Sequence, residues 1–100
     1  MPASNPMAGS PYRGTPLGYV KMTSFNSAAV ALSSIPAGAT YAILQAETAT
    51  VRLTDDGTAP TSTKGLLLAT GTIITYTGDL DAVQVIGTGS TSILHILYYR

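Results

Sequence analysis

Residues 40–54 read TYAILQAETATVRLT, a stretch in which the two alternating sets of positions differ in character. Alternation with a period of two is typical of a β-strand that turns one face toward a core. In the first half of the stretch, Ile43 and Leu44 fall on opposite faces. In the second half, Val51 and Leu53 fall on the same face and are expected to point inward. The stretch therefore predicts two strands.

A tight turn near Glu47 and Thr48 would join these two strands, which cover residues 40–46 and 50–54. Consecutive strands joined by a short turn commonly pair as an antiparallel hairpin. We therefore expect a hairpin here, with Arg52 pointing outward.

The same kind of pattern extends from residue 18 to the end of the sequence. Short runs rich in Val, Ile, Leu, Thr and Tyr alternate with Gly, Pro, Asn and Asp, a combination that indicates an all-β protein. About eight short antiparallel strands favour a single small β-sandwich or jelly roll. The alanines of 28–32 are also compatible with a helical turn. The expected strands are 18–25, 28–33, 40–46, 50–54, 65–69, 72–76, 82–86 and 92–98.

Residues 1–17 differ from the sandwich domain, residues 18–100, because they are rich in Pro, Gly and Ser and show no periodicity. Proline lacks a backbone donor, so this segment is predicted to be an extended N-terminal arm. A segment with so few apolar residues does not order itself, and we expect it to dock on a neighbouring chain, or otherwise on its own domain. The candidate partner-interface residues in this arm are Pro2, Pro6, Met7, Pro11, Tyr12, Arg13 and Pro16.

The composition excludes several classes of function. Apolar residues make up 45% of the chain and charged residues only 10%, with a net charge of zero. No field attracts nucleic acid or an anionic membrane, so neither is an expected partner. No apolar run is long enough to span a membrane, and we expect synthesis without a signal peptide. The absence of cysteine excludes disulfides and thiolate metal sites.

The stretch from Ile93 to Tyr99, at the last predicted strand, is apolar on both alternating faces. One face is expected to meet the core. The other should be covered by a second sheet, by the arm or by another subunit, because large exposed apolar patches are rare in monomers. Tyr98, Tyr99 and Arg100 are candidate partner-interface residues, since Tyr and Arg are enriched at interfaces; they are equally compatible with the simple end of an edge strand.

No catalytic or metal-binding motif stands out. His95, the only histidine, is interpreted as a half-buried side chain hydrogen-bonded to a neighbour rather than as a base or metal ligand. Asp55, Asp56, Asp79 and Asp81 flank glycines, where aspartate commonly caps turns, and calcium binding is the alternative interpretation. We therefore expect a protein that is not an enzyme and that needs no cofactor or metal.

The glycine-rich stretch Gly87-Thr88-Gly89-Ser90 is similar to part of a phosphate-binding loop. It lies between two expected strands rather than before a helix, so a phosphate role is not supported. We interpret it as a hairpin turn.

The run VRLTDDGTAPT at 51–61, followed by GLLL at 65–68, YTGDL at 76–80 and ILYY at 96–99, resembles small virion proteins of tailed bacteriophages. The likeness covers roughly residues 35–99 and leaves out the N-terminal arm. It implies a β-sandwich decoration or cement protein on the capsid surface of the virion, made in the host cytoplasm, that bridges and stabilises major capsid subunits. It also implies a homo-oligomer, with a trimer favoured. No functional residue is transferred, because such proteins act through surface shape.

Two alternatives remain open. One is a carbohydrate- or receptor-binding module, or another head or tail component, of the virion. The other is a small enzyme, which would require a concave pocket that holds His95 and a carboxylate.

Overall fold

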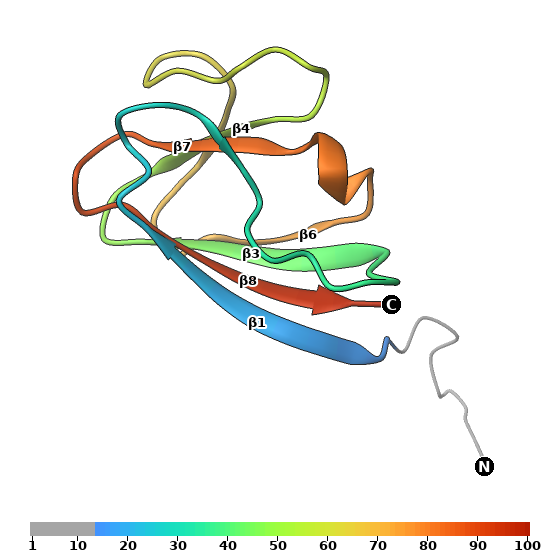
Figure 1. Ribbon diagram of the computed structural model, residues 1–100. Coiled ribbons are helices and arrows are strands. Elements are labelled where there is room, and N and C mark those ends of the chain that lie inside the picture. The colour runs from blue at the N-terminus through green and yellow to red at the C-terminus, as the bar shows by residue number, and fades with distance from the viewer. Residues whose placement is uncertain (1–13) are drawn as a thin grey trace.

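The computed structural model describes residues 14–100, which form a sandwich of two antiparallel sheets (Figure 1). Six of the predicted interface residues, Pro2, Pro6, Met7, Pro11, Tyr12 and Arg13, lie outside the described residues. One sheet has the strand order β1-β8-β3-β6 and the other β2-β7-β4-β5. The predicted all-β sandwich is confirmed. The elements are β1 (Pro16–Thr23), β2 (Val30–Ala31), β3 (Tyr41–Glu47), β4 (Val51–Thr54), β5 (Leu66–Leu68), β6 (Ile73–Tyr76), the 3₁₀ turn η1 (Leu80–Ala82), β7 (Gln84–Gly87) and β8 (Ile93–Tyr99).

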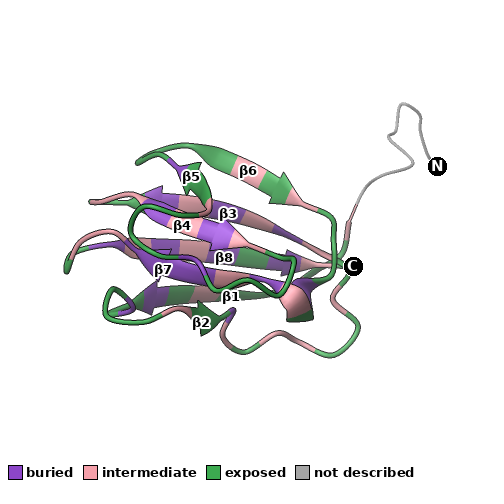
Figure 2. Ribbon diagram, turned by 90° about the horizontal axis from the view of Figure 1, so that it is seen from above, coloured by how far each residue is buried: buried purple, intermediate pink, exposed green. Residues whose placement is uncertain are grey.

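Buried residues alternate with less buried ones along the central strands (Figure 2), and the buried side chains form the core between the sheets. β3 and β8 each bury every second residue, as a strand with one covered face should. Fully burying one such aliphatic side chain stabilises the fold by about 1.5–3 kcal/mol. Within residues 14–100, no helix is long and apolar enough to cross a lipid bilayer. The largest fully buried side chains are Tyr98, Leu44, Leu94, Ile96, Val51, Val83 and Val85.

The predicted hairpin between residues 40–46 and 50–54 is wrong. β3 pairs with β6 and β8, whereas β4 pairs with β5 and β7 in the other sheet. The tight turn exists: Thr48 has a φ of 74°, and the N–H of Ala49 donates to the carbonyl of Glu47 over 2.8 Å. It carries the chain from one sheet to the other. The alternating pattern shows which side chains face the core. The pattern is the same whether two strands are paired in one sheet or lie in opposite sheets, so it does not predict pairing.

The stretch from Gly87 to Ser90 is also not a hairpin turn, because it joins β7 in one sheet to β8 in the other. Hydrogen bonds, most of them from hydroxyl groups, connect this β7–β8 connection to the β3–β4 connection, which also passes from one sheet to the other. The carbonyl of Thr50 accepts hydrogen bonds from the N–H and the hydroxyl of Thr88 and from the hydroxyl of Ser92, each over 3.0 Å. These bonds satisfy a partly buried carbonyl at the point where both chains change sheets.

The first strand begins inside the segment predicted to be an arm. Pro16 opens β1 and lies opposite Tyr99, and a register shift follows before Gly18. Two backbone hydrogen bonds between Thr15 and Arg100, of 2.8 and 3.0 Å, extend this pairing. Proline is tolerated here because it is the first residue of an edge strand, a position where a missing backbone N–H does not interrupt the hydrogen bonds of the sheet. The stretch 28–33 is a strand of only two residues, Val30–Ala31.

Tyr98 belongs to the core, so its interpretation as a partner-interface residue is not supported. Its side chain is fully buried, and its hydroxyl donates to the carbonyl of Ser33 over 2.7 Å. Burial raises the pKa of Tyr98 to about 12. This bond connects β8 to the segment between β2 and β3, so the tyrosine links a central strand to a loop.

Replacing Tyr98 with Phe should lower the free energy of unfolding by about 1–2 kcal/mol, because the buried carbonyl of Ser33 loses its donor while the ring still fills the core. Urea denaturation measures the change. Tyr99→Phe, which alters a half-buried tyrosine on the opposite face of the same strand, is the matched control and should change stability little. An equal loss in both variants would contradict the assignment.

The stability of the protein should also fall at alkaline pH. The folded-state pKa of Tyr98, about 12, lies above the ordinary value of 10.0, so the fold favours the neutral phenol. The stabilisation from this group is complete below pH 10 and is lost as the pH rises toward 12. The stability advantage of the wild type over Tyr98→Phe should therefore shrink between pH 10 and 12. Tyr76, whose pKa is also raised to about 12, is present in both proteins.

Candidate functional site

The sheet β1-β8-β3-β6 presents one side to the core and the other to solvent; its outward-pointing side chains are termed the outer face. The pairing register places Tyr19 beside Leu97, and Leu97 beside Ile43, across three strands. Tyr19 and Leu97 are 56% and 40% exposed, and Ile73, farther along the sheet, is 62% exposed. The outer face is thus apolar over much of its width and open to solvent among the described residues.

A shallow groove of about 320 Å³ runs along the outer face. Its lining comes from all four strands of the sheet, so hydrogen-bonded backbone fixes its shape. The groove combines apolar walls with a phenol, an amide and an imidazole. The lining residues are Tyr19, Ile43, Gln45, Ile73, His95 and Leu97.

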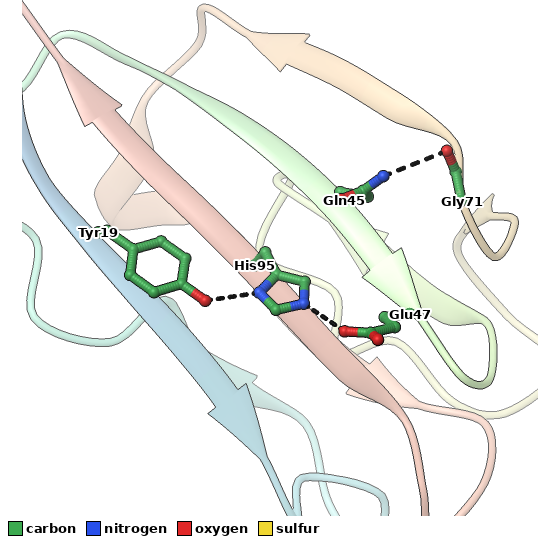
Figure 3. A network of polar contacts seen from close by, with 5 residues as sticks. All are labelled: Tyr19, Gln45, Glu47, Gly71 and His95. Atoms are coloured by element: carbon green, nitrogen blue, oxygen red, sulfur yellow. Dashed lines mark hydrogen bonds and ion pairs between the residues drawn. The ribbon is translucent and has the colours of Figure 1, made fainter.

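A line of polar contacts connects Tyr19 and His95, which line the groove, to Glu47 on β3 (Figure 3). The hydroxyl of Tyr19 lies 2.7 Å from Nδ1 of His95, and Nε2 of His95 lies 2.5 Å from Oε1 of Glu47. An ionised carboxylate only accepts hydrogen bonds, so Nε2 carries the proton. In the neutral imidazole Nδ1 then accepts from Tyr19. Each group is therefore oriented by the next, and the contacts hold β1, β8 and β3 in one arrangement.

The electrostatics of this line centre on Glu47. The hydrogen bond from His95 holds the pKa of the Glu47 carboxyl below its ordinary value, and the charge of Lys21 acts in the same direction. His95 remains partly exposed, with 25% of its side chain open to solvent. The interpretation of His95 as a half-buried side chain bonded to neighbours is confirmed.

The order carboxylate, imidazole, hydroxyl also occurs in hydrolytic triads. His95 lies in a concave feature next to a carboxylate, so this observation alone does not separate the enzyme alternative from a binding role. Such chemistry depends on a water-excluded site with donors directed at a developing charge. Glu47 is 57% exposed and Tyr19 56% exposed, so water reaches both ends of the line.

The other sequence-predicted residues are dispersed. Tyr99 lies on the outer face and stacks on Tyr41, with ring centroids 5.2 Å apart. Pro16 and Arg100 are exposed at the same end of the sheet. The structure therefore brings Pro16, Tyr99 and Arg100 together and separates them from Tyr98, which points into the core.

Asp56 and Asp79 have the predicted turn roles, whereas the Asp55 carboxylate accepts from the hydroxyl of Tyr76. Oδ1 of Asp56 accepts from the N–H of Thr58, and Oδ1 of Asp79 accepts from the N–H of Asp81, each over 3.0 Å. Among residues 14–100, no three His, Cys, Asp or Glu side chains gather as a metal site would require.

The sequence reasoning did not identify Tyr19, Glu47 or the groove. One signal was present, because the alternation of residues 40–46 placed Ile43 and Gln45 on a common face. The missing information was strand order: Tyr19, Glu47 and His95 come from three strands whose adjacency no local pattern encodes.

Comparison with known proteins supplies no identity. The chain matches no protein-family model, no curated protein and no solved structure. The functional argument therefore depends on the geometry described above.

If His95 holds the Glu47 carboxyl in its ionised form, His95→Leu should raise the pKa of Glu47 toward its ordinary value. An NMR pH titration of the side-chain carboxyl carbons measures this shift. Asp56 is an internal control, because its lowered pKa depends on the N–H of Thr58, and it should not change. A Glu47 pKa that stays the same in the variant would contradict the proposed hydrogen bond.

Proposed function

We propose that this chain is a structural component of a tailed-phage virion, a decoration or cement protein that binds major capsid subunits through its outer face. The observation that carries the proposal is the exposed apolar surface of Tyr19, Leu97 and Ile73 on one sheet. Isolated exposed apolar residues are ordinary, but a grouped set on one face marks an interaction site. The resemblance of residues 35–99 to phage virion proteins supplies the class of partner.

The outer face is suited to binding because it is already ordered. Its side chains stand on hydrogen-bonded strands, and the contacts from Tyr19 through His95 to Glu47 restrain the polar ones. Pre-ordered groups lose less conformational entropy on association, so more of the contact energy appears as affinity. Apolar residues with a few satisfied polar groups also match the usual composition of protein interfaces.

The low charge of the chain supports the same role. With 10% charged residues and no net charge, the surface exerts little long-range repulsion on a copy or a partner. On a symmetric shell, many weak contacts act together and hold a component far more firmly than one contact does. The proposed mechanism is mechanical bridging at the capsid surface by a homo-oligomer, with no chemical step and no cofactor.

A carbohydrate-binding role in the virion is the second candidate. The exposed ring of Tyr19 and the amide of Gln45 lie in the same groove, and the hydroxyls of a sugar could pair with such polar groups while its apolar face meets an aromatic ring. Binding of the isolated protein on a glycan array, lost in Tyr19→Ala, would favour this candidate over the capsid role.

The capsid role is tested by mixing the purified protein with tailed-phage particles assembled without it. We expect co-sedimentation with the particles and a higher temperature of particle disruption. Leu97→Glu should weaken binding by about tenfold or more, because it places a charge in an apolar contact.

Ala31→Glu is the matched control for this experiment. Ala31 is exposed and lies on β2 in the other sheet, opposite Gln84, so the substitution adds the same charge to a surface away from the outer face. The control should bind as the wild type does. Failure of the wild type to co-sediment would remove the capsid proposal, and equal weakening in both variants would move the contact away from the outer face.

A further inference from the structure

The three most exposed large aliphatic side chains of the described residues lie on two neighbouring strands. Leu66 and Leu67 of β5 are 72% and 55% exposed, and Ile73 of β6 is 62% exposed. β5 and β6 are edge strands of the two sheets and lie on the same side of the sandwich (Figure 2). This side, formed by β5 and β6, is termed the open flank.

The open flank is not sealed between the sheets. An opening of about 270 Å³ lies between the end of β4 and the two edge strands. Leu53, Leu66 and Ile74 supply apolar walls, and Tyr76 closes part of one end by donating to Oδ2 of Asp55 over 2.6 Å. The flank therefore offers side-chain contacts as well as the unpaired backbone groups of two strand edges.

The opposite edge of the same sheet is protected. β1 carries three features that hinder pairing with another strand: Pro16 at its start, an irregular register before Gly18, and the charged side chain of Lys21. β6 has the sequence IITY, without proline, without charge and without a register shift. Proteins usually block free edges with such features, so an edge that lacks them is suited to a partner strand.

We propose that the open flank is a contact between two copies of this chain, in which β6 pairs antiparallel with β6 of the second copy. A second copy has the same unprotected β6 edge. One two-fold contact therefore pairs the β6 edges of both copies, and it closes the assembly as a dimer. Pairing β6 with β1 of another copy would instead meet Pro16 and Lys21, and it would leave free edges at both ends.

The charges of the flank favour this arrangement. Asp55 and Asp79 lie near the end of β6 at Tyr76, whereas residues 70–72 at its other end carry no charge. Antiparallel pairing places the acidic end of each copy beside the uncharged end of the other. The two acidic groups are then separated by about the length of a four-residue strand, roughly 13 Å, which exceeds the screening length at physiological salt.

The pleat restricts the register. Residues directly opposite each other must point to the same face, so the two-fold axis passes through a residue rather than between two. An axis at Ile74 or Thr75, the two central residues of β6, keeps most of the strand paired. The first register places Ile73 opposite the partner's Thr75, and the second places Thr75 opposite the partner's Thr75. Both registers add β6 of the second copy to the sheet without reversing its outer face.

The mass of the purified protein in solution tests the contact. Sedimentation equilibrium should give twice the chain mass of 10.3 kDa, and Thr75→Lys should raise the dimer dissociation constant at least tenfold. Thr23→Lys is the matched control, an exposed outward threonine on the protected edge, and it should leave the dimer intact. A monomer, a trimer, or equal sensitivity to both substitutions would overturn the proposal.

Cross-linking tests the strand pairing itself, because the chain has no cysteine. The double variant Ile73→Cys/Thr75→Cys should form a covalent dimer on mild oxidation in either register, since directly opposite residues lie within disulfide reach. Lys21→Cys/Thr23→Cys on β1 is the control and should cross-link much less. Equal cross-linking of the two would contradict pairing through β6. Both measurements use the protein alone, so their outcome is separate from that of the capsid experiment.

Discussion

The inward side chains of β3 and β8 pack against those of β4 and β7. This contact between the sheets determines which side chains of these strands are buried and which face outward. Leu44 and Ile96 come from one sheet, Val51 and Val85 from the other, and all four are fully buried. With no cysteine in the chain, no disulfide supplements this packing. Each central strand of the sheet β1-β8-β3-β6 contributes every second side chain to the core, and the alternate positions are turned outward.

The outward positions carry the surface chemistry. Because Leu94, Ile96 and Tyr98 are held in the core, His95 and Leu97 must face solvent on the same strand. The groove and its polar line are thus a direct consequence of the strand period. The two surfaces of interest meet at β6: the outer face extends across the sheet from β1 to β6, the open flank lies along β5 and β6, and Ile73 belongs to both.

The sequence predicted the number of strands, their approximate limits and most inward positions, because a period of two is visible in short stretches such as residues 40–46. It did not predict which strands are neighbours. The expected hairpin after β3 failed because a three-residue turn with Thr48 at positive φ changes sheets, and alternation cannot distinguish that path. The line from Tyr19 to Glu47 was missed for the same reason. Tyr98 was misassigned because both faces of its strand are apolar.

The position of β8 within its sheet has a consequence for the order of folding. Within residues 14–100, β8 is the last strand, yet it lies between β1 and β3 and is the only neighbour of β1. Among these described strands, only β4 and β5 are consecutive along the chain and paired with each other. During synthesis, β1 therefore meets its partner among the described strands only after β8 has left the ribosome. Closing such distant pairings carries a large loop entropy, which is characteristic of slowly folding β proteins. A nascent chain that stops before Ile93 lacks the strand with which β1 pairs in the described part of the protein.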